Sequence, residues 1–305
     1  MGKVNVTEVV SPVWGKCAKI ENEQIELLVT LEFGPRVIHA SRIGKENMMF
    51  EDLDRTPLGE KQDVFSETLK LCGGHRLWIS PEILPRCYYP DSKPVEFEPT
   101  ENGGIFTAPV EDYNFIQKSI QITLMEDEPS VSIAHTVKNC GAWDIYFAHW
   151  CITMLAPGGK EVIPVPVEKT GLLPNRVLTL WDYSDIGDPR VHWGNRYITL
   201  KQDSSMENAF KVGINSEAGW AAYFNRGQVF IKTFDTVPGG AYPDGGCSFE
   251  TYTNGKMLEC ETLGEFVDLE PGDEATLYEH WDLYATDIVP SDDPDELDKL
   301  MEDFD

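Results

Sequence analysis

Short runs of hydrophobic and β-branched residues recur along the whole chain, and clusters of Gly, Pro, Asn and Asp separate them. Such runs are typical of antiparallel strands, and Asn-Gly dipeptides such as Asn254-Gly255 are typical of hairpin turns. The sequence predicts strands over residues 25–33, 36–41, 105–109, 119–125, 130–138, 145–155, 218–223 and 229–234. We therefore expect an all-β fold, a large antiparallel sandwich, rather than alternating strands and helices.

A helical pattern occurs at the acidic C-terminal end, within residues 286–305. Leu297, Leu300, Met301 and Phe304 have the spacing of one helical stripe, which predicts a short helix docked on the body of the protein. No repeat or low-complexity linker divides the chain. We expect a single domain over residues 1–305, with the helix packed against it.

The strand-like stretch around residues 257–263 places two carboxylates on one face. Side chains alternate along a strand, so Glu259 and Glu261 share a face with Met257 and Leu263. Two like charges on a partly dry face repel each other, and such pairs persist mainly where a ligand, a cation or a proton uses them. The alternative is an ordinary solvated strand face.

The Asn254-Gly255 turn predicts that residues 247–252 form a hairpin with residues 256–263. Glu250 would then lie on the same sheet face as Glu259 and Glu261. Three carboxylates in one place would suit a hard cation such as calcium, although we expect neither a resident metal nor a cofactor.

Charge excludes several partners. The chain has 52 Asp and Glu residues against 25 Lys and Arg, which gives a formal net charge of -27. This charge repels phosphate backbones and anionic bilayers, so nucleic acid and membranes are not expected partners. With no secretory leader or long apolar run, and with seven scattered cysteines that lack metal-site spacing, we expect a cytoplasmic protein with free thiols.

Three further regions combine aromatic rings with hydrogen-bonding groups of the kind that line small-molecule sites. Each can equally be an ordered structural loop. The candidate binding residues in these regions are His75, Arg76, Trp78 and Glu82 in the loop after Gly73-Gly74, Trp193 in the aromatic segment 181–197, and Tyr242 and Asp244 in the Gly-rich loop before Glu250.

His149 lies inside the strong strand signal of residues 145–155. Its imidazole titrates near neutrality and suits general acid catalysis, whereas a histidine within a strand is also commonly a satisfied core residue. The choice between these roles depends on a carboxylate nearby.

Several short motifs, in order along nearly the whole chain, resemble the galactose mutarotase-like (aldose 1-epimerase-like) superfamily. They are Gly34-Pro35-Arg36-Val37-Ile38-His39, Gly44-Lys45-Glu46-Asn47, Gly73-Gly74 with Trp78, Glu259 to Thr262, Leu269-Glu270-Pro271-Gly272-Asp273 and Glu279-His280-Trp281-Asp282. The resemblance implies an antiparallel supersandwich with a sugar cleft on the concave face of one sheet, and it is closest to an uncharacterised branch.

By position, Glu261 resembles the glutamate that acts as base in true aldose 1-epimerases, with Glu259 as the alternate, and His149 resembles the histidine that acts as acid. The chain departs from the family at Cys72, where a histidine normally precedes the Gly-Gly pair. Two hypotheses follow. The protein is a carbohydrate-active, epimerase-like isomerase, or it is a non-catalytic saccharide-binding or sensing module; a role in assembly is a third interpretation.

Overall fold

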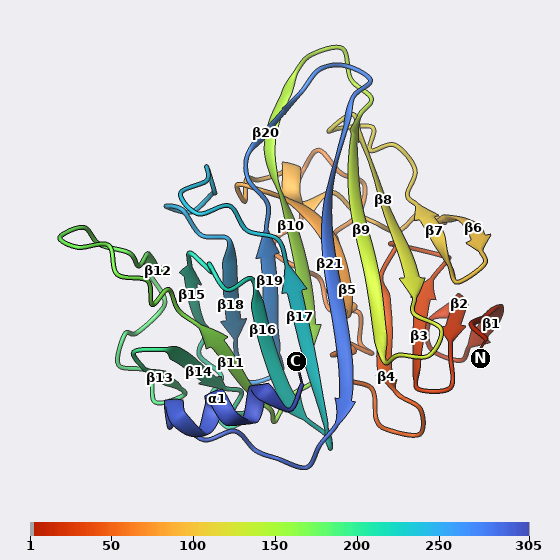
Figure 1. The fold of residues 1–305 in the computed structure, drawn as a ribbon. Helices are drawn as coiled ribbons and strands as arrows, with labels where there is room; N and C mark the ends of the chain where they lie inside the picture. The colour runs from red at the N-terminus through yellow and green to blue at the C-terminus, as the bar shows by residue number, and fades with distance from the viewer. Residues whose placement is uncertain (1–2, 305) are drawn as a thin grey trace.

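A computed structural model describes residues 3–304, which form two large antiparallel sheets packed face to face (Figure 1). The 11 strands of the first sheet, among these residues, are in spatial order β1 (Asn5–Ser11), β2 (Gly15–Glu21), β3 (Ile25–Thr30), β4 (Val37–Arg42), β5 (His75–Ser80), β10 (Ile145–Leu155), β19 (Leu258–Leu263), β18 (Phe249–Thr253), β15 (Phe210–Ile214) and β12 (Leu178–Leu180), with β20 (Val267–Leu269) paired to β10.

The second sheet has 10 strands among the same described residues, and it lies in front in Figure 1. In spatial order they are β13 (Val191–Trp193), β14 (Tyr197–Lys201), β11 (Lys160–Pro164), β16 (Trp220–Asn225), β17 (Gln228–Phe234), β21 (Glu274–Ala285), β9 (Ser130–Asn139), β8 (Ile116–Leu124), β7 (Gly103–Thr107) and β6 (Glu96–Thr100). The all-β sandwich expected from the sequence is confirmed.

The main core lies between the two sheets and is built by the inward side chains of both. Strand alternation supplies these residues: Leu77, Cys151 and Leu258 from the first sheet meet Phe230 and Leu283 from the second. Every second residue on the strands of the first sheet therefore points to its other, outer face. A smaller hydrophobic cluster covers that outer face, and it includes Trp78, Trp150, Ile152, Leu69 and Leu71.

Helix α1 (Pro294–Glu302) packs on the outer face of the second sheet, in front of it in Figure 1. The Asp293 side chain caps the helix by accepting hydrogen bonds from two backbone N–H groups of its first turn. Leu297 and Leu300 are buried against residues such as Val162 and Ile231. The predicted C-terminal helix and its apolar stripe are confirmed, and the helix is shorter than the acidic tail.

Two elements that the sequence predicts hold the charged side chains described below. Residues 145–155 form β10 with the predicted bounds, and the hairpin around Asn254-Gly255 joins β18 to β19 in antiparallel register. In that register Glu250 stands opposite Glu261 and Tyr252 stands opposite Glu259. All four side chains therefore share the outer face of the first sheet.

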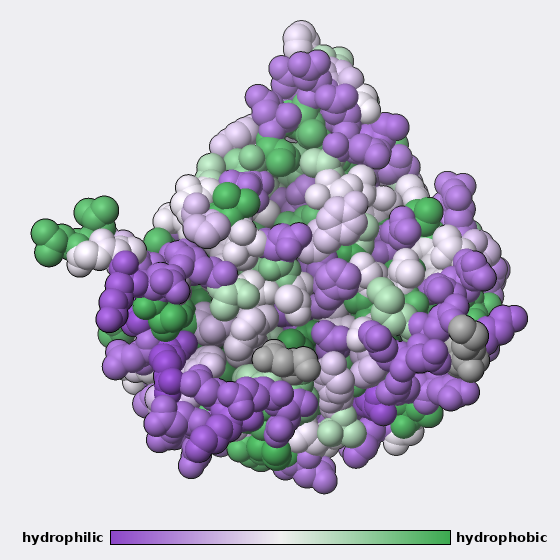
Figure 2. Space-filling view, viewed as in Figure 1, coloured by the Kyte–Doolittle hydropathy of each residue, from purple (hydrophilic) through white to green (hydrophobic). Residues whose placement is uncertain are grey.

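The surface in Figure 2 is the face formed by the second sheet and α1, and it is mainly hydrophilic. A hydrophobic tip protrudes at the left of this view, where the loop between β11 and β12 carries the exposed Leu172 and Leu173. Among the described residues no helix is long and apolar enough to cross a bilayer.

Candidate functional site

A cluster of charged side chains lies on the outer face of the first sheet, over β15, β18 and β19. The Lys211 ammonium is its centre: Nζ lies 2.7 Å from Glu250 Oε2 and 2.9 Å from Glu261 Oε2. Lys211 is buried, and its ammonium also lies over the rings of Trp150 and Trp181, at 4.7 Å and 4.6 Å from their centroids. Burial disfavours the charged form of this lysine, but the two carboxylates outweigh burial and raise its pKa.

Glu261 is fully buried and has two donors on one of its oxygens. Trp150 Nε1 donates a hydrogen bond of 2.6 Å to Oε2, the same oxygen that accepts from Lys211. The other oxygen, Oε1, has no hydrogen-bond partner among the described residues. Buried oxygens are normally paired, so Glu261 Oε1 is an acceptor with hydrogen-bonding capacity left.

Two neighbouring carboxyl groups, those of Glu259 and Glu250, have raised pKa values. The pKa of Glu259 is raised to about 8 by burial, by the nearby Glu261 charge and by a side-chain hydrogen bond with Glu261. The positive charges of Arg76 and Lys211 oppose this shift. Burial also raises the pKa of Glu250 to about 8, against the opposing effect of Lys211. Glu259 therefore carries a proton at neutral pH and can donate it.

Arg76 and Trp78 extend this face onto β5. Arg76 stands opposite Ile152 of β10, and Ile152 stands opposite Glu261. The Arg76 guanidinium stacks on the Trp78 ring, with its central carbon 4.1 Å from the ring centroid. Trp78 in turn contacts the rings of Trp150 and Tyr88, each at 5.4 Å between centroids. The predicted residues Arg76, Trp78, Glu250, Glu259 and Glu261 thus lie on one face.

Glu82 lies at the rim of this face, where it is exposed and accepts a hydrogen bond from the Tyr88 hydroxyl. Three other predicted binding residues lie elsewhere. Trp193 belongs to β13 of the second sheet and donates through Nε1 to Ile186 O. Tyr242 lines a separate surface hollow with Val237 and Ser248, and the backbone oxygen of the exposed Asp244 accepts a hydrogen bond from Thr179.

His149 and Glu261 lie on opposite faces of the first sheet. The side chain of His149 points between the sheets, where Nε2 donates to Ala275 O at 3.0 Å, and burial lowers its pKa to about 4. Neighbouring Trp150 is the β10 residue that reaches Glu261. The structure therefore does not bring together the acid and base suggested by the family resemblance.

His75 also points between the sheets, away from the charged face. His75 Nε2 lies 2.6 Å from His135 Nε2, and His135 Nδ1 lies 3.3 Å from Leu277 O. A carbonyl only accepts, so His135 Nδ1 is the donor there and its Nε2 accepts from His75. His75 Nδ1 then accepts from Thr153 Oγ1 at 2.9 Å, so both imidazoles are neutral and paired.

Three potential metal ligands meet at this inner position. One ligand atom each of His75, His135 and Glu279 lies within 4.8 Å of the others, a donor set that zinc accepts. However, Lys232 Nζ lies 2.9 Å from Glu279 Oε1 and supplies a positive charge to the same buried carboxylate. The cluster is thus electrostatically paired by the chain's own ammonium group, and we assign no metal to it.

Sequence reasoning missed Lys211, Trp150 and Trp181 as members of the charged cluster. Lys211 had a detectable signal, since it is a lysine inside the apolar run of β15. Its partner Glu250 is 39 positions later in the chain, and only the β15–β18 pairing brings the two strands together. The sequence predicts which side chains alternate along each strand, but it does not predict which distant strands pair.

Neither a protein-family model nor a curated protein sequence matches the chain. Solved structures do match. A candidate aldose 1-epimerase from Klebsiella pneumoniae is 11% identical, with a TM-score of 0.63, over 99% of this chain and 87% of that one. A galactose mutarotase-like protein from Lactobacillus casei is 10% identical, with a TM-score of 0.58, over 88% of this chain and 100% of that one.

A TPR-domain containing protein from Parabacteroides distasonis is 11% identical, with a TM-score of 0.60, over 95% of this chain but only 55% of its own length. The chain therefore spans about half of that protein. Many of the similar structures are galactose mutarotase-like or aldose 1-epimerase proteins. At these identities the likeness shows the fold, and the chain has the galactose mutarotase-like fold.

Proposed function

We propose that the outer face of the first sheet binds a saccharide and that Glu261 acts there as a base in an aldose epimerase-like reaction. One observation carries the proposal: Glu261 is held by Trp150 and Lys211 through one oxygen, while its other oxygen is buried without a partner. Such a carboxylate is pre-positioned to accept a proton from a ligand hydroxyl.

The surroundings of Glu261 support a sugar as the ligand. Indole and phenol rings offer flat apolar faces to a sugar ring, and Trp150, Trp181, Tyr183 and Tyr252 all lie near the charged cluster. The fold agrees with this choice, since several proteins of similar structure are described as mutarotase-like.

Glu259 takes the role of acid in this proposal, in place of His149. The Glu261 carboxylate removes the proton from the anomeric hydroxyl, and protonated Glu259 gives its proton to the ring oxygen. The bond between the anomeric carbon and the ring oxygen breaks, which yields the open-chain aldehyde. Reclosure on the opposite face of the carbonyl returns both protons and gives the other anomer.

The test is anomer exchange measured by NMR over a panel of aldoses. We expect the wild-type protein to accelerate exchange for at least one sugar, and Glu261→Gln to lower that rate by about 100-fold or more because the base is lost. Glu98→Gln, which alters an exposed carboxylate of β6, is the matched control. Equal rates for the wild-type protein and Glu261→Gln would rule out this base.

A non-catalytic saccharide-binding or sensing module is the second candidate. The observation in its favour is that His149 lies on the other face of the sheet and that Cys72 precedes the Gly-Gly pair, so neither of the two positions suggested by the resemblance supplies a histidine acid at Glu261. Calorimetric binding of a sugar without any acceleration of anomer exchange would favour this role over the enzyme.

A further inference from the structure

Arg76 is a buried cation that stacks on Trp78 and has two nitrogens without a hydrogen-bond partner among the described residues. Its side chain is 4% exposed, and neither Nε nor Nη1 has a hydrogen-bond partner among the described residues. Burial lowers the pKa of Arg76 to about 10, so the guanidinium is still charged at neutral pH. An unpartnered buried charge is costly, and its retention is best explained by a partner that does not belong to the chain.

The carboxylates near Arg76 already have other partners. Asp91 is bound to Arg36 at 2.7 Å, Glu111 is bound to Lys118 at 2.7 Å, and Glu261 is bound to Lys211. Neither Nε nor Nη1 of Arg76 bonds to Glu259, which itself carries a proton at neutral pH. None of these groups gives Arg76 a direct counter-ion.

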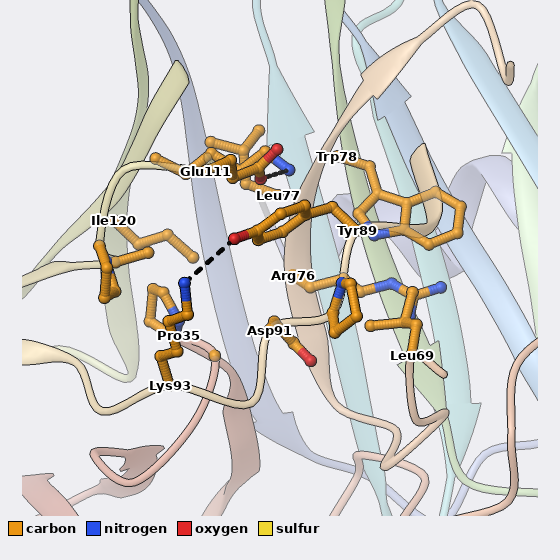
Figure 3. A pocket seen from close by; sticks show the side chains of 15 residues that line it. Pro35, Leu69, Arg76, Leu77, Trp78, Tyr89, Asp91, Lys93, Glu111 and Ile120 are labelled. Carbon is orange, nitrogen blue, oxygen red and sulfur yellow. Dashed lines mark hydrogen bonds and ion pairs between the residues drawn. The ribbon is translucent and has the colours of Figure 1, made fainter. Parts of the chain in front are cut away.

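Arg76 is one of the residues that line a surface pocket, and Glu259, Glu261 and Lys211 are not among them. Figure 3 shows the Arg76 guanidinium beside Leu69 and Trp78. Asp91 and the ring of Tyr89 also line the pocket. The other lining side chains are mostly apolar, for example Pro35 and Ile120. A mainly apolar pocket with one unsatisfied cation is the arrangement in which a single charged group orients a small ligand.

We propose that Arg76 binds an anionic substituent, a carboxylate or a phosphate, on the sugar that lies over Glu261. This inference rests on the proposed function, and it adds the class of substrate. Arg76 and Glu261 are separated by one strand, β10, so their backbones lie about 10 Å apart, twice the spacing between neighbouring strands. A single monosaccharide with a charged substituent can bridge this separation.

Guanidinium groups form short, charge-assisted hydrogen bonds with carboxylates and phosphates. The overall charge of the protein works in the opposite direction, since a net charge of -27 repels anions at long range. A preference for an acidic sugar would therefore report a local cation and not general electrostatic attraction.

The test is calorimetry with sets of three related sugars: a neutral aldose, its uronic acid and its 6-phosphate. We expect one of the acidic forms to bind at least about 10-fold more tightly than the neutral parent, and the favoured form identifies carboxylate or phosphate as the substituent. Arg76→Gln should abolish this preference. Lys16→Gln, which removes an exposed positive charge on β2, should retain it.

Equal or tighter binding of the neutral sugar would overturn the anion inference while the proposed saccharide site would stand. If no sugar of any kind binds, both proposals fail. Stability gives a second readout: because Arg76 has no hydrogen-bonded carboxylate to lose and methionine can keep an apolar contact with the Trp78 ring, Arg76→Met should keep or raise the unfolding midpoint in urea. A marked fall in that midpoint would show that the chain itself satisfies Arg76, and it would also overturn the inference.

Discussion

Glu250 and Glu261 stand directly opposite each other on neighbouring antiparallel strands, and both carboxylates reach the same ammonium group of Lys211. Like charges directly opposite on a sheet are destabilising unless something compensates them. Here the compensation comes from a third strand, β15, which brings Lys211 within 2.9 Å of both. The charged cluster is therefore an interlocked unit that holds Glu261 in one position.

Replacing Lys211 by Met should destabilise the protein strongly, because the buried Glu261 side chain would lose its ammonium partner. We expect a loss of ~3 kcal/mol or more in the free energy of unfolding at pH 7.5, measured with urea. Lys201→Met, at an exposed lysine of β14, is the control, and a loss below about 1 kcal/mol in Lys211→Met would contradict the arrangement.

Glu161 should make stability fall as the pH rises. This residue is fully buried on β11, and burial raises its pKa to about 8, above the ordinary 4.5. The folded protein then binds the proton more tightly than the unfolded chain does. Its contribution to stability is full below pH 4.5 and is lost as the pH rises through 8.

The comparison with Glu161→Gln isolates this contribution, because Gln has a similar shape and does not ionise. Between pH 6 and pH 9 the urea midpoint of the wild-type protein should fall further than that of the variant. The difference corresponds to a few kcal/mol in the free energy of unfolding, in order of magnitude. Parallel pH profiles would show that Glu161 does not titrate in this range.

His149 should behave as a structural residue. Burial lowers its pKa to about 4, so its imidazole NMR signals should not shift between pH 5.5 and pH 8. His149→Phe loses the hydrogen bond to Ala275 O and should lower stability by ~1–2 kcal/mol, while the affinity for a bound sugar stays within about twofold. A large loss of affinity or of anomer exchange at unchanged stability would instead give His149 a direct functional role.

The buried pair of Lys232 and Glu279 should be strongly coupled. Lys232 Nζ also donates to two backbone carbonyls, those of Cys151 and Cys260, each at 3.1 Å. Lys232→Met leaves the Glu279 charge buried and uncompensated, so we expect a loss of ~3–5 kcal/mol in urea unfolding. The double variant Lys232→Met/Glu279→Gln should lose less than the sum of the single variants. Additive losses would mean that the two groups do not interact.

Much of the fold could be predicted from the sequence because its signals are local. The bounds of β10, the hairpin of β18 and β19 and the apolar stripe of α1 all follow from alternation, turn residues and helical spacing within a few neighbouring residues. The shared face of Glu250, Glu259 and Glu261 could be predicted because one short turn, at Asn254-Gly255, joins their two strands. The register of β18 with β19 confirms that these three residues share a face.

The rest of the site depends on pairing between strands that are distant in the sequence. Alternation alone puts His149 on one face of β10 and Trp150 on the other, but it does not say which face meets Glu261. That choice comes from the register of β10 with β19, in which Ile152 stands opposite Glu261. Trp150 is on the same face as Ile152, and His149 is not.

The sequence by itself determined the strands, the C-terminal helix and the carboxylates of one hairpin, since each depends on short-range geometry. Only the tertiary structure decided that Lys211 sits between Glu250 and Glu261, that His75 and His149 point into the core and that Arg76 has two nitrogens without a hydrogen-bond partner among the described residues. These features arise where strands far apart in the chain pair and where the two sheets pack, and no local pattern of residues encodes them.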